Sequence, residues 1–145
     1  MHLTTTRIID VPIDRLWSLQ LDHASWPQHL PNFSSVRRLD PDAPFAVGSA
    51  AEITQPALGT VTWTVTELAV EPARRTYMWQ GSAKGVRYAG SHLVEAVGSS
   101  TRMTLGIRAD GPLISVLGRL VRGRMQRAID DEAAAFERWA VTAQV

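Results

Sequence analysis

An imidazole and a phenol share one face of a predicted strand in the second half of the chain. In the stretch VRYAGSHLVEA, residues 86–96, every second position reads Tyr88, Gly90, His92 and Val94. Because side chains alternate between the two faces of a strand, Tyr88 and His92 lie on the face of Val94, which we expect to meet the core. Buried polar groups need partners, so this face is predicted to border a cavity holding water or a ligand, with Gly90 leaving space.

His92 also has a purely structural interpretation, as a core histidine held by one neighbouring hydroxyl or carbonyl group. The shared face with Tyr88 favours the cavity hypothesis, in which both side chains orient a bound molecule through hydrogen bonds. A catalytic role would use His92 as a general base and Tyr88 to polarise a carbonyl, and it requires both groups within reach of a common substrate atom. His92 and Tyr88 are therefore candidate catalytic residues, although spacing identifies no partner for His92.

Five tryptophans are candidates either for the core or for the wall of such a cavity. Trp17 and Trp139 are expected to pack in the core, since a buried indole needs only one hydrogen bond. Trp63 and Trp79 lie on predicted strands whose inner face would meet a helix, so they are expected to line the cavity and stack on a flat ligand. Trp26, in the segment SWPQHLP, is expected near the cavity mouth, although helix packing explains it equally well.

Other chemistries find little support in the residue types. The four histidines show no metal-ligand spacing, because His23 and His29 do not have the i, i+4 separation that places two ligands on one helix face. There is no GxSxG nucleophile motif, and GSAKG at residues 81–85 indicates a hairpin turn rather than a phosphate loop. The absence of cysteine excludes disulfides, thiolate nucleophiles and cysteine-based zinc sites. We therefore expect neither a metal nor a cofactor.

The charge pattern argues against nucleic acid as a partner. A formal net charge of +1 leaves no excess of cations to neutralise phosphates. The one local cluster consists of Arg119, Arg122, Arg124 and Arg127, and we expect it to be a solvated helix face partly balanced by the acids at 130–132. A membrane surface or an acidic partner is the less favoured alternative.

The length of 145 residues suits one domain, which we expect to span residues 1–145. The N-terminal residues do not have the pattern of a signal peptide, and no apolar run is long enough to span a bilayer. The protein is therefore expected to be cytoplasmic, without an integral membrane segment, and either a monomer or a homodimer.

Alternation of apolar and polar residues predicts an antiparallel sheet with one face buried against the core and the other exposed to solvent. It is clearest in TVTWTVTEL, where Val61, Trp63 and Val65 share one face and threonines take the other. The predicted strands span residues 2–11, 33–39, 49–55, 59–70, 74–80, 86–97 and 101–110. Short helices are expected after Pro12 and around Pro27.

A long helix is predicted from Pro112 to about Ala140. Gly118 and Gly123 each weaken its first half by roughly 1 kcal/mol relative to alanine, so we expect that half to bend or move. Its apolar stripe is expected to lie on the sheet and contains Leu113, Leu117, Leu120, Met125, Ala128, Glu132, Phe136 and Trp139.

This order of elements resembles the helix-grip (SRPBCC) superfamily, which joins START lipid-transfer domains, birch-pollen-allergen-like proteins and bacterial polyketide cyclase/dehydrase-like proteins. The stretches that carry the resemblance are VPIDRLWSLQLDHASWPQHLPNFSSVRRLD (11–40), WTVTEL (63–68), SHLVEAV (91–97) and GPLISVLGRLVRGRMQRAIDDEAAAF (111–136). It implies an α+β fold: a curved seven-stranded antiparallel sheet around a long C-terminal helix, with two short helices after the first strand. It also implies a cavity that commonly takes lipids, sterols or polyketides, in relatives of which some are enzymes and many are binders.

We therefore expect the protein to bind a small hydrophobic molecule, of lipid, polyketide or aromatic type, between the sheet and the C-terminal helix. Tyr88 and His92 would fix its orientation by hydrogen bonds. The expected wall consists of Trp26, Trp63, Trp79, Met103, Leu105, Leu117 and Leu120. Two alternatives remain: a cofactor-independent polyketide cyclase or dehydratase using the same cavity, and a co-chaperone-like module, which a filled cavity with an exposed apolar patch would favour.

Overall fold

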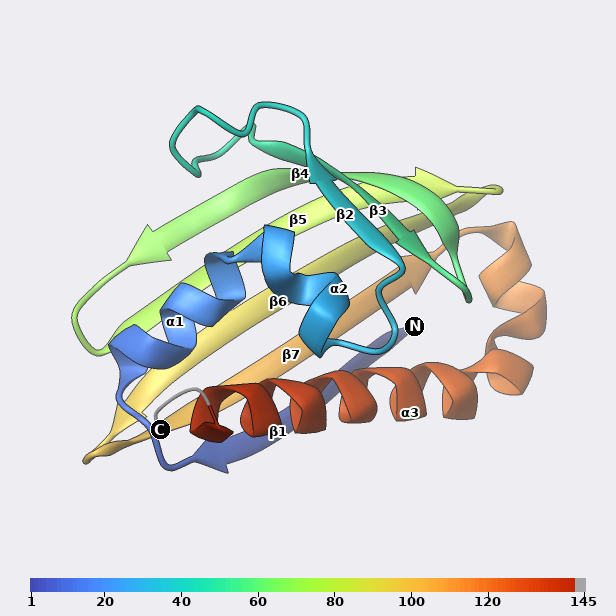
Figure 1. The fold of residues 1–145 in the computed structure, drawn as a ribbon. Coiled ribbons are helices and arrows are strands. Elements are labelled where there is room, and N and C mark those ends of the chain that lie inside the picture. Colours follow the sequence, from blue (N-terminus) through green and yellow to red (C-terminus); the bar gives the residue numbers. More distant parts are fainter. Residues whose placement is uncertain (143–145) are drawn as a thin grey trace.

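A seven-stranded antiparallel sheet curves around the longest helix of the chain (Figure 1). The computed structural model describes residues 1–142, so the last three residues of the predicted domain lie outside the described residues. The elements in chain order are β1 (His2–Ile9), α1 (Ile13–Leu21), the 3-10 helix η1 (His23–Ser25), α2 (Trp26–His29), β2 (Ser35–Arg38), β3 (Ala50–Gln55), β4 (Gly59–Val70), β5 (Arg74–Ala83), β6 (Val86–Val97), β7 (Ser100–Asp110) and α3 (Pro112–Thr142). The predicted α+β helix-grip architecture is confirmed.

The strands follow one another as hairpins, except that the first strand joins the last. The sheet order is β1-β7-β6-β5-β4-β3-β2, and β1 pairs with β7 in a register that sets Leu3 opposite Ile107. The β5–β6 turn consists of Lys84 and Gly85, both at positive φ (53° and 79°), which suits the right-handed twist of a two-residue hairpin. Ala83 pairs with Val86, so β5 runs three residues farther than predicted.

The core lies between the concave face of the sheet and the helices. Strand alternation puts Val61, Trp63 and Val65 of β4 on this inner face, as predicted. Trp26 and Phe136 are among the largest fully buried side chains, and their rings pack edge to face at 5.7 Å. Helix packing therefore accounts for Trp26, which is the second of the two explanations that the sequence left open.

The long helix α3 has two differently packed halves. Its second half buries Phe136 and Trp139, and an Arg7–Glu137 ion pair of 2.6 Å ties it to β1. In Figure 1 the light-orange start of α3 runs at an angle to the rest, in the region of the two helical glycines, as the sequence predicted.

The bend turns the first part of the predicted apolar stripe away from the sheet. Leu113, Leu117 and Leu120 are 48%, 37% and 80% exposed, so Leu117 and Leu120 are not part of an interior wall. This expectation was wrong because a continuous helical stripe assumes a straight axis, and here the axis changes direction. Over residues 1–142, no helix has both the length and the apolar character needed to cross a membrane.

Candidate functional site

His92 is buried on the inner face, where it belongs to a hydrogen-bonded cluster. It lies opposite Tyr77 on the neighbouring strand β5, and the two rings stack at 4.5 Å with an interplanar angle of 10°. Its Nδ1 is 2.5 Å from Oε1 of Gln20, whose Nε2 donates to Sδ of Met103 at 3.1 Å. Because the amide group turns its N–H towards sulfur, Nδ1 of His92 carries a proton and donates it to Gln20.

Tyr77 and His23 extend the same cluster towards the end of α1. The Tyr77 hydroxyl donates to the Gln20 carbonyl at 3.1 Å, an oxygen in the last turn of the helix, which has no intrahelical partner. Nε2 of His23 is also 3.1 Å from the phenol oxygen. Since the phenol has one proton, Nε2–H of His23 donates to it, which leaves Nδ1 of His23 as a buried acceptor without a partner among the described residues.

Burial keeps both imidazoles of the cluster neutral. It lowers the pKa of His23 to about 3, and the positive charge of Arg38 lowers it further in the same direction. Burial also lowers the pKa of His92 to about 3, with His23 as the second cause. A base with so low a pKa accepts protons poorly near neutral pH, and the contacts of His92 match the structural interpretation of a hydrogen-bonded core histidine.

Tyr88 has different neighbours from His92, although both face inward. Four residues along one strand separate their Cα atoms by about 13 Å. A Cβ at the intervening Gly90 would lie 2.9 Å from Nε1 of Trp79, so the indole of Trp79 fills the space that we expected Gly90 to leave for a ligand. The Tyr88 ring instead lies 6.1 Å from the Trp63 ring, and the structure does not bring Tyr88 and His92 together.

Trp63, Trp79, Tyr88 and Ile107 form what we call the inner wall of the concave face. Trp79 joins this wall to the polar cluster, because its ring packs edge to face against His92 at 5.8 Å. The Trp63 and Trp79 rings are 5.8 Å apart, and Ile107 lies opposite Gly90 on β7. Tyr88 and Ile107 are only half-buried and pack against the core from its edge. Nε1 of Trp63 is buried and has no hydrogen-bond acceptor among the described residues.

Two further predicted wall residues are part of the packed interior. Met103 and Leu105 are buried on β7, and Leu105 lies opposite His92. Met103 accepts the hydrogen bond from Gln20. Their role in this structure is to surround the polar cluster.

Glu132 is a candidate that the sequence did not single out as functional. It lies one helical turn before the buried Phe136 of α3, and its side chain is half-buried. Burial raises the pKa of its carboxyl to about 8, and its charge adds to the burial that raises the pKa of Tyr77 well above 10. The signal available in the sequence was its position as the one charged member of the predicted apolar stripe.

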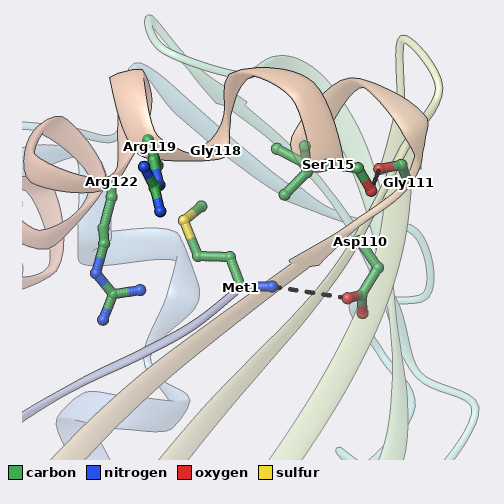
Figure 2. A pocket seen from close by; sticks show the side chains of 8 residues that line it. Met1, Asp110, Gly111, Ser115, Gly118, Arg119 and Arg122 are labelled. Atoms are coloured by element: carbon green, nitrogen blue, oxygen red, sulfur yellow. Dashed lines mark hydrogen bonds and ion pairs between the residues drawn. The ribbon is translucent and has the colours of Figure 1, made fainter.

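Two hollows occur among the described residues, one away from this site and one beside it. One of about 270 Å³ lies under the bent start of α3 (Figure 2) and is lined by Met1, Asp110, Gly111, Ile114, Ser115, Gly118, Arg119 and Arg122. The other, beside His23, Phe45 and Trp79, is too narrow to admit water. Over residues 1–142, no three histidine or carboxylate side chains gather closely enough to hold a metal ion.

Comparisons with known proteins agree with this geometry. The family model described as polyketide cyclase / dehydrase and lipid transport matches residues 1–139, whereas no curated protein matches the chain. A hypothetical protein from Helicobacter pylori has a similar structure, with a TM-score of 0.85 at 15% identity over 97% of this chain and 88% of that one. A START superfamily protein from Mycobacterium smegmatis gives 0.80 at 15% identity, covering 98% of each chain. An aromatase/cyclase from a Streptomyces species gives 0.72 at 20% identity over 97% and 93%. The chain therefore belongs to the polyketide cyclase/dehydrase and lipid transport family, within the helix-grip superfamily.

Proposed function

We propose that this protein binds a small, flat hydrophobic molecule between the inner wall and α3. The family and the fold support a ligand-binding or cyclase role. The finer proposal is a ligand of polyketide or aromatic type that stacks on indole rings and carries at least one oxygen acceptor. Pockets of this kind are mostly apolar, with a few polar groups that set orientation.

The observation that carries the proposal is the unpartnered indole N–H of Trp63. A buried donor without an acceptor costs roughly 1–3 kcal/mol, so a purely structural site would favour an aromatic ring without the N–H. Trp63 lies beside the half-buried Tyr88, whose hydroxyl is a second polar group at the same edge of the core. A carbonyl or hydroxyl oxygen on a ligand would satisfy Trp63 while its rings replace water against Tyr88 and Ile107.

A fluorescent naphthyl ketone tests the proposal, because its carbonyl accepts a hydrogen bond and its emission shifts in apolar surroundings. The Trp63→Phe substitution removes the donor and keeps an aromatic ring, so it should weaken binding about three- to tenfold, the usual contribution of one hydrogen bond. Trp139→Phe is the matched control, since Trp139 stacks on His29 in the other part of the core. Equal affinities of the wild type and Trp63→Phe would contradict the proposal.

Native mass spectrometry of the purified protein is the complementary measurement. A co-purifying compound that is retained by Trp139→Phe and lost from Trp63→Phe would give the chemical class of the natural ligand. A compound lost equally from both variants would contradict the assignment to Trp63.

Glu132 supports a second candidate, an enzyme that moves a proton on the bound molecule. A carboxyl whose pKa is raised to about 8 exchanges protons near neutral pH, as a general acid or base must. In this hypothesis Glu132 replaces His92 and Tyr88 as the acid–base residue of a cyclase-type reaction. Turnover of a poly-β-ketone model substrate should then inflect near the pKa of Glu132 and vanish in Glu132→Gln, while that variant still binds the naphthyl ketone.

A further inference from the structure

We propose that residues 112–127, the first half of α3, dock on the surface of a membrane containing anionic lipids. We call this segment the basic half-helix. It carries an exposed aliphatic stripe and four arginines that form no ion pair within residues 1–142. The proposal does not depend on the ligand hypothesis, because it concerns the outer side of α3 and would stand if no small molecule bound the inner wall.

The aliphatic stripe follows helical spacing but faces solvent. Its members, at positions i, i+3, i+4 and i+7, are Leu113, Val116, Leu117 and Leu120, with exposed fractions of 48%, 78%, 37% and 80%. A surface helix of a globular protein normally turns such a stripe towards the core. Here the bend in α3 leaves it outside, and no other described element packs over these four side chains.

The charges of the basic half-helix are all positive. Residues 112–127 contain Arg119, Arg122, Arg124 and Arg127 and no aspartate or glutamate. The whole chain has a net charge of +1, so the remaining residues carry −3 and the positive charge is concentrated at this end. Amphipathic helices that lie on anionic membranes combine an aliphatic face with basic residues in this way.

The expected neutralisation of these arginines by nearby acids does not occur. None of the four takes part in the ion pairs formed within residues 1–142. Asp130, the nearest following acid, instead accepts a hydrogen bond from Gln126 at 3.0 Å. The guanidinium groups therefore remain available to phosphates.

The size and composition of the patch favour a membrane over a protein partner. Four partly exposed aliphatic side chains offer about 300 Å² of apolar surface. A stable protein interface needs about 800 Å² from each partner and is enriched in aromatic residues, which the stripe lacks. A membrane contact needs only a shallow aliphatic face, with arginine stems lying along it and their charged ends at the headgroups.

The hollow under the basic half-helix is a separate feature from the stripe. It is lined from α3 by residues that alternate around the helix with the stripe positions, among them Ser115, Gly118 and Arg122, so it lies on the opposite side of α3. Figure 2 shows this side, where Asp110 lies 3.8 Å from the amino group of Met1. The docking proposal therefore rests on the outer side of the half-helix alone.

Vesicle sedimentation tests the proposal. The full-length protein should sediment at low salt with vesicles of equal parts phosphatidylcholine and phosphatidylglycerol, and not with phosphatidylcholine alone. Arg124→Gln combined with Arg127→Gln should weaken binding about 25-fold, since each basic residue near an anionic surface contributes about fivefold. Leu113→Gln combined with Leu120→Gln should weaken it at least tenfold through the lost apolar contact.

Matched control variants carry the same changes elsewhere on the surface. Ile8→Gln combined with Val70→Gln removes two apolar side chains that are each 58% exposed, and Arg74→Gln combined with Arg87→Gln removes two exposed arginines. Controls that bind like the wild type, with losses confined to the basic half-helix, would support the proposal. A folded wild type that fails to sediment with the anionic vesicles, or controls that lose as much as the test variants, would overturn it. So would a dimer in analytical ultracentrifugation that Leu113→Gln with Leu120→Gln dissociates, because a second copy would then cover the stripe.

Discussion

Two buried histidines and the half-buried Glu132 should give the protein opposing responses to pH. The pKa values of His23 and His92 fall from 6.5 to about 3 on folding, so the stability they contribute is present above pH 6.5 and is lost as the pH falls towards 3. The pKa of Glu132 rises from 4.5 to about 8, so its cost is absent below pH 4.5 and grows as the pH rises towards 8. Acidification therefore lowers the free energy of unfolding through the two histidines and raises it through Glu132.

The magnitudes nearly cancel over one range of pH. Between about pH 7.5 and about pH 5, protonation of the unfolded state removes about 2 kcal/mol of stability for each histidine. Over the same range the cost of keeping Glu132 protonated falls by about 3 kcal/mol. The stability difference between Glu132→Gln and the wild type should therefore shrink by about 3 kcal/mol on acidification, and Glu132→Gln should be the more acid-sensitive protein.

Urea denaturation followed by tryptophan fluorescence at a series of pH values measures this difference. The exposed neighbour Asp131 provides the control, since Asp131→Asn changes a carboxyl on the same helix and should follow the wild type. If the curves for Glu132→Gln, Asp131→Asn and the wild type ran parallel from about pH 7.5 to about pH 5, the assignment of a raised pKa to Glu132 would be refuted.

Three further substitutions test the packing of the interior and of α3. Gly90→Ala should lower the free energy of unfolding by about 1–3 kcal/mol, because the new Cβ would lie 2.9 Å from Nε1 of Trp79. Urea titration followed by indole fluorescence would report the loss of stability and the displacement of Trp79. Tyr77→Phe should cost about 1–3 kcal/mol in the same assay, since it leaves the Gln20 carbonyl without its donor. Gly123→Ala should instead stabilise by about 0.5–1 kcal/mol, because its Cβ meets only a side-chain atom at 3.7 Å, and unchanged or lower thermal stability would contradict this.

The sheet and the long helix were predictable because their signals are local. Alternation in β4 and the Pro and Gly residues between strands marked the hairpins, and the boundaries of β4 and β6 match the prediction. The end of β5 was missed because the first residues of GSAKG extend the strand, and only Lys84 and Gly85 form the turn.

The site was less predictable because its contacts join distant parts of the chain. Tyr88 and His92 were correctly placed on one face, but the residue that fills the space between them, Trp79, comes from the neighbouring strand. The partner of His92 is Gln20, 72 positions away, and no spacing rule connects them. The direction in which α3 bends is likewise a tertiary property, although the glycines that permit the bend were visible in the sequence.

The pairing of β1 with β7 also constrains how the protein is made. Strand β1 has a single neighbour in the sheet, and its partner residues lie about a hundred positions later in the chain. At about 5–20 residues per second, a ribosome needs roughly 5–20 s to supply that partner, during which β1 has no strand to pair with. The hairpins β2–β7 can form in order as they emerge, but the sheet edge on which α3 rests is completed last. Chaperones that bind nascent chains at the ribosome are therefore expected to contact β1 before β7 has been synthesised.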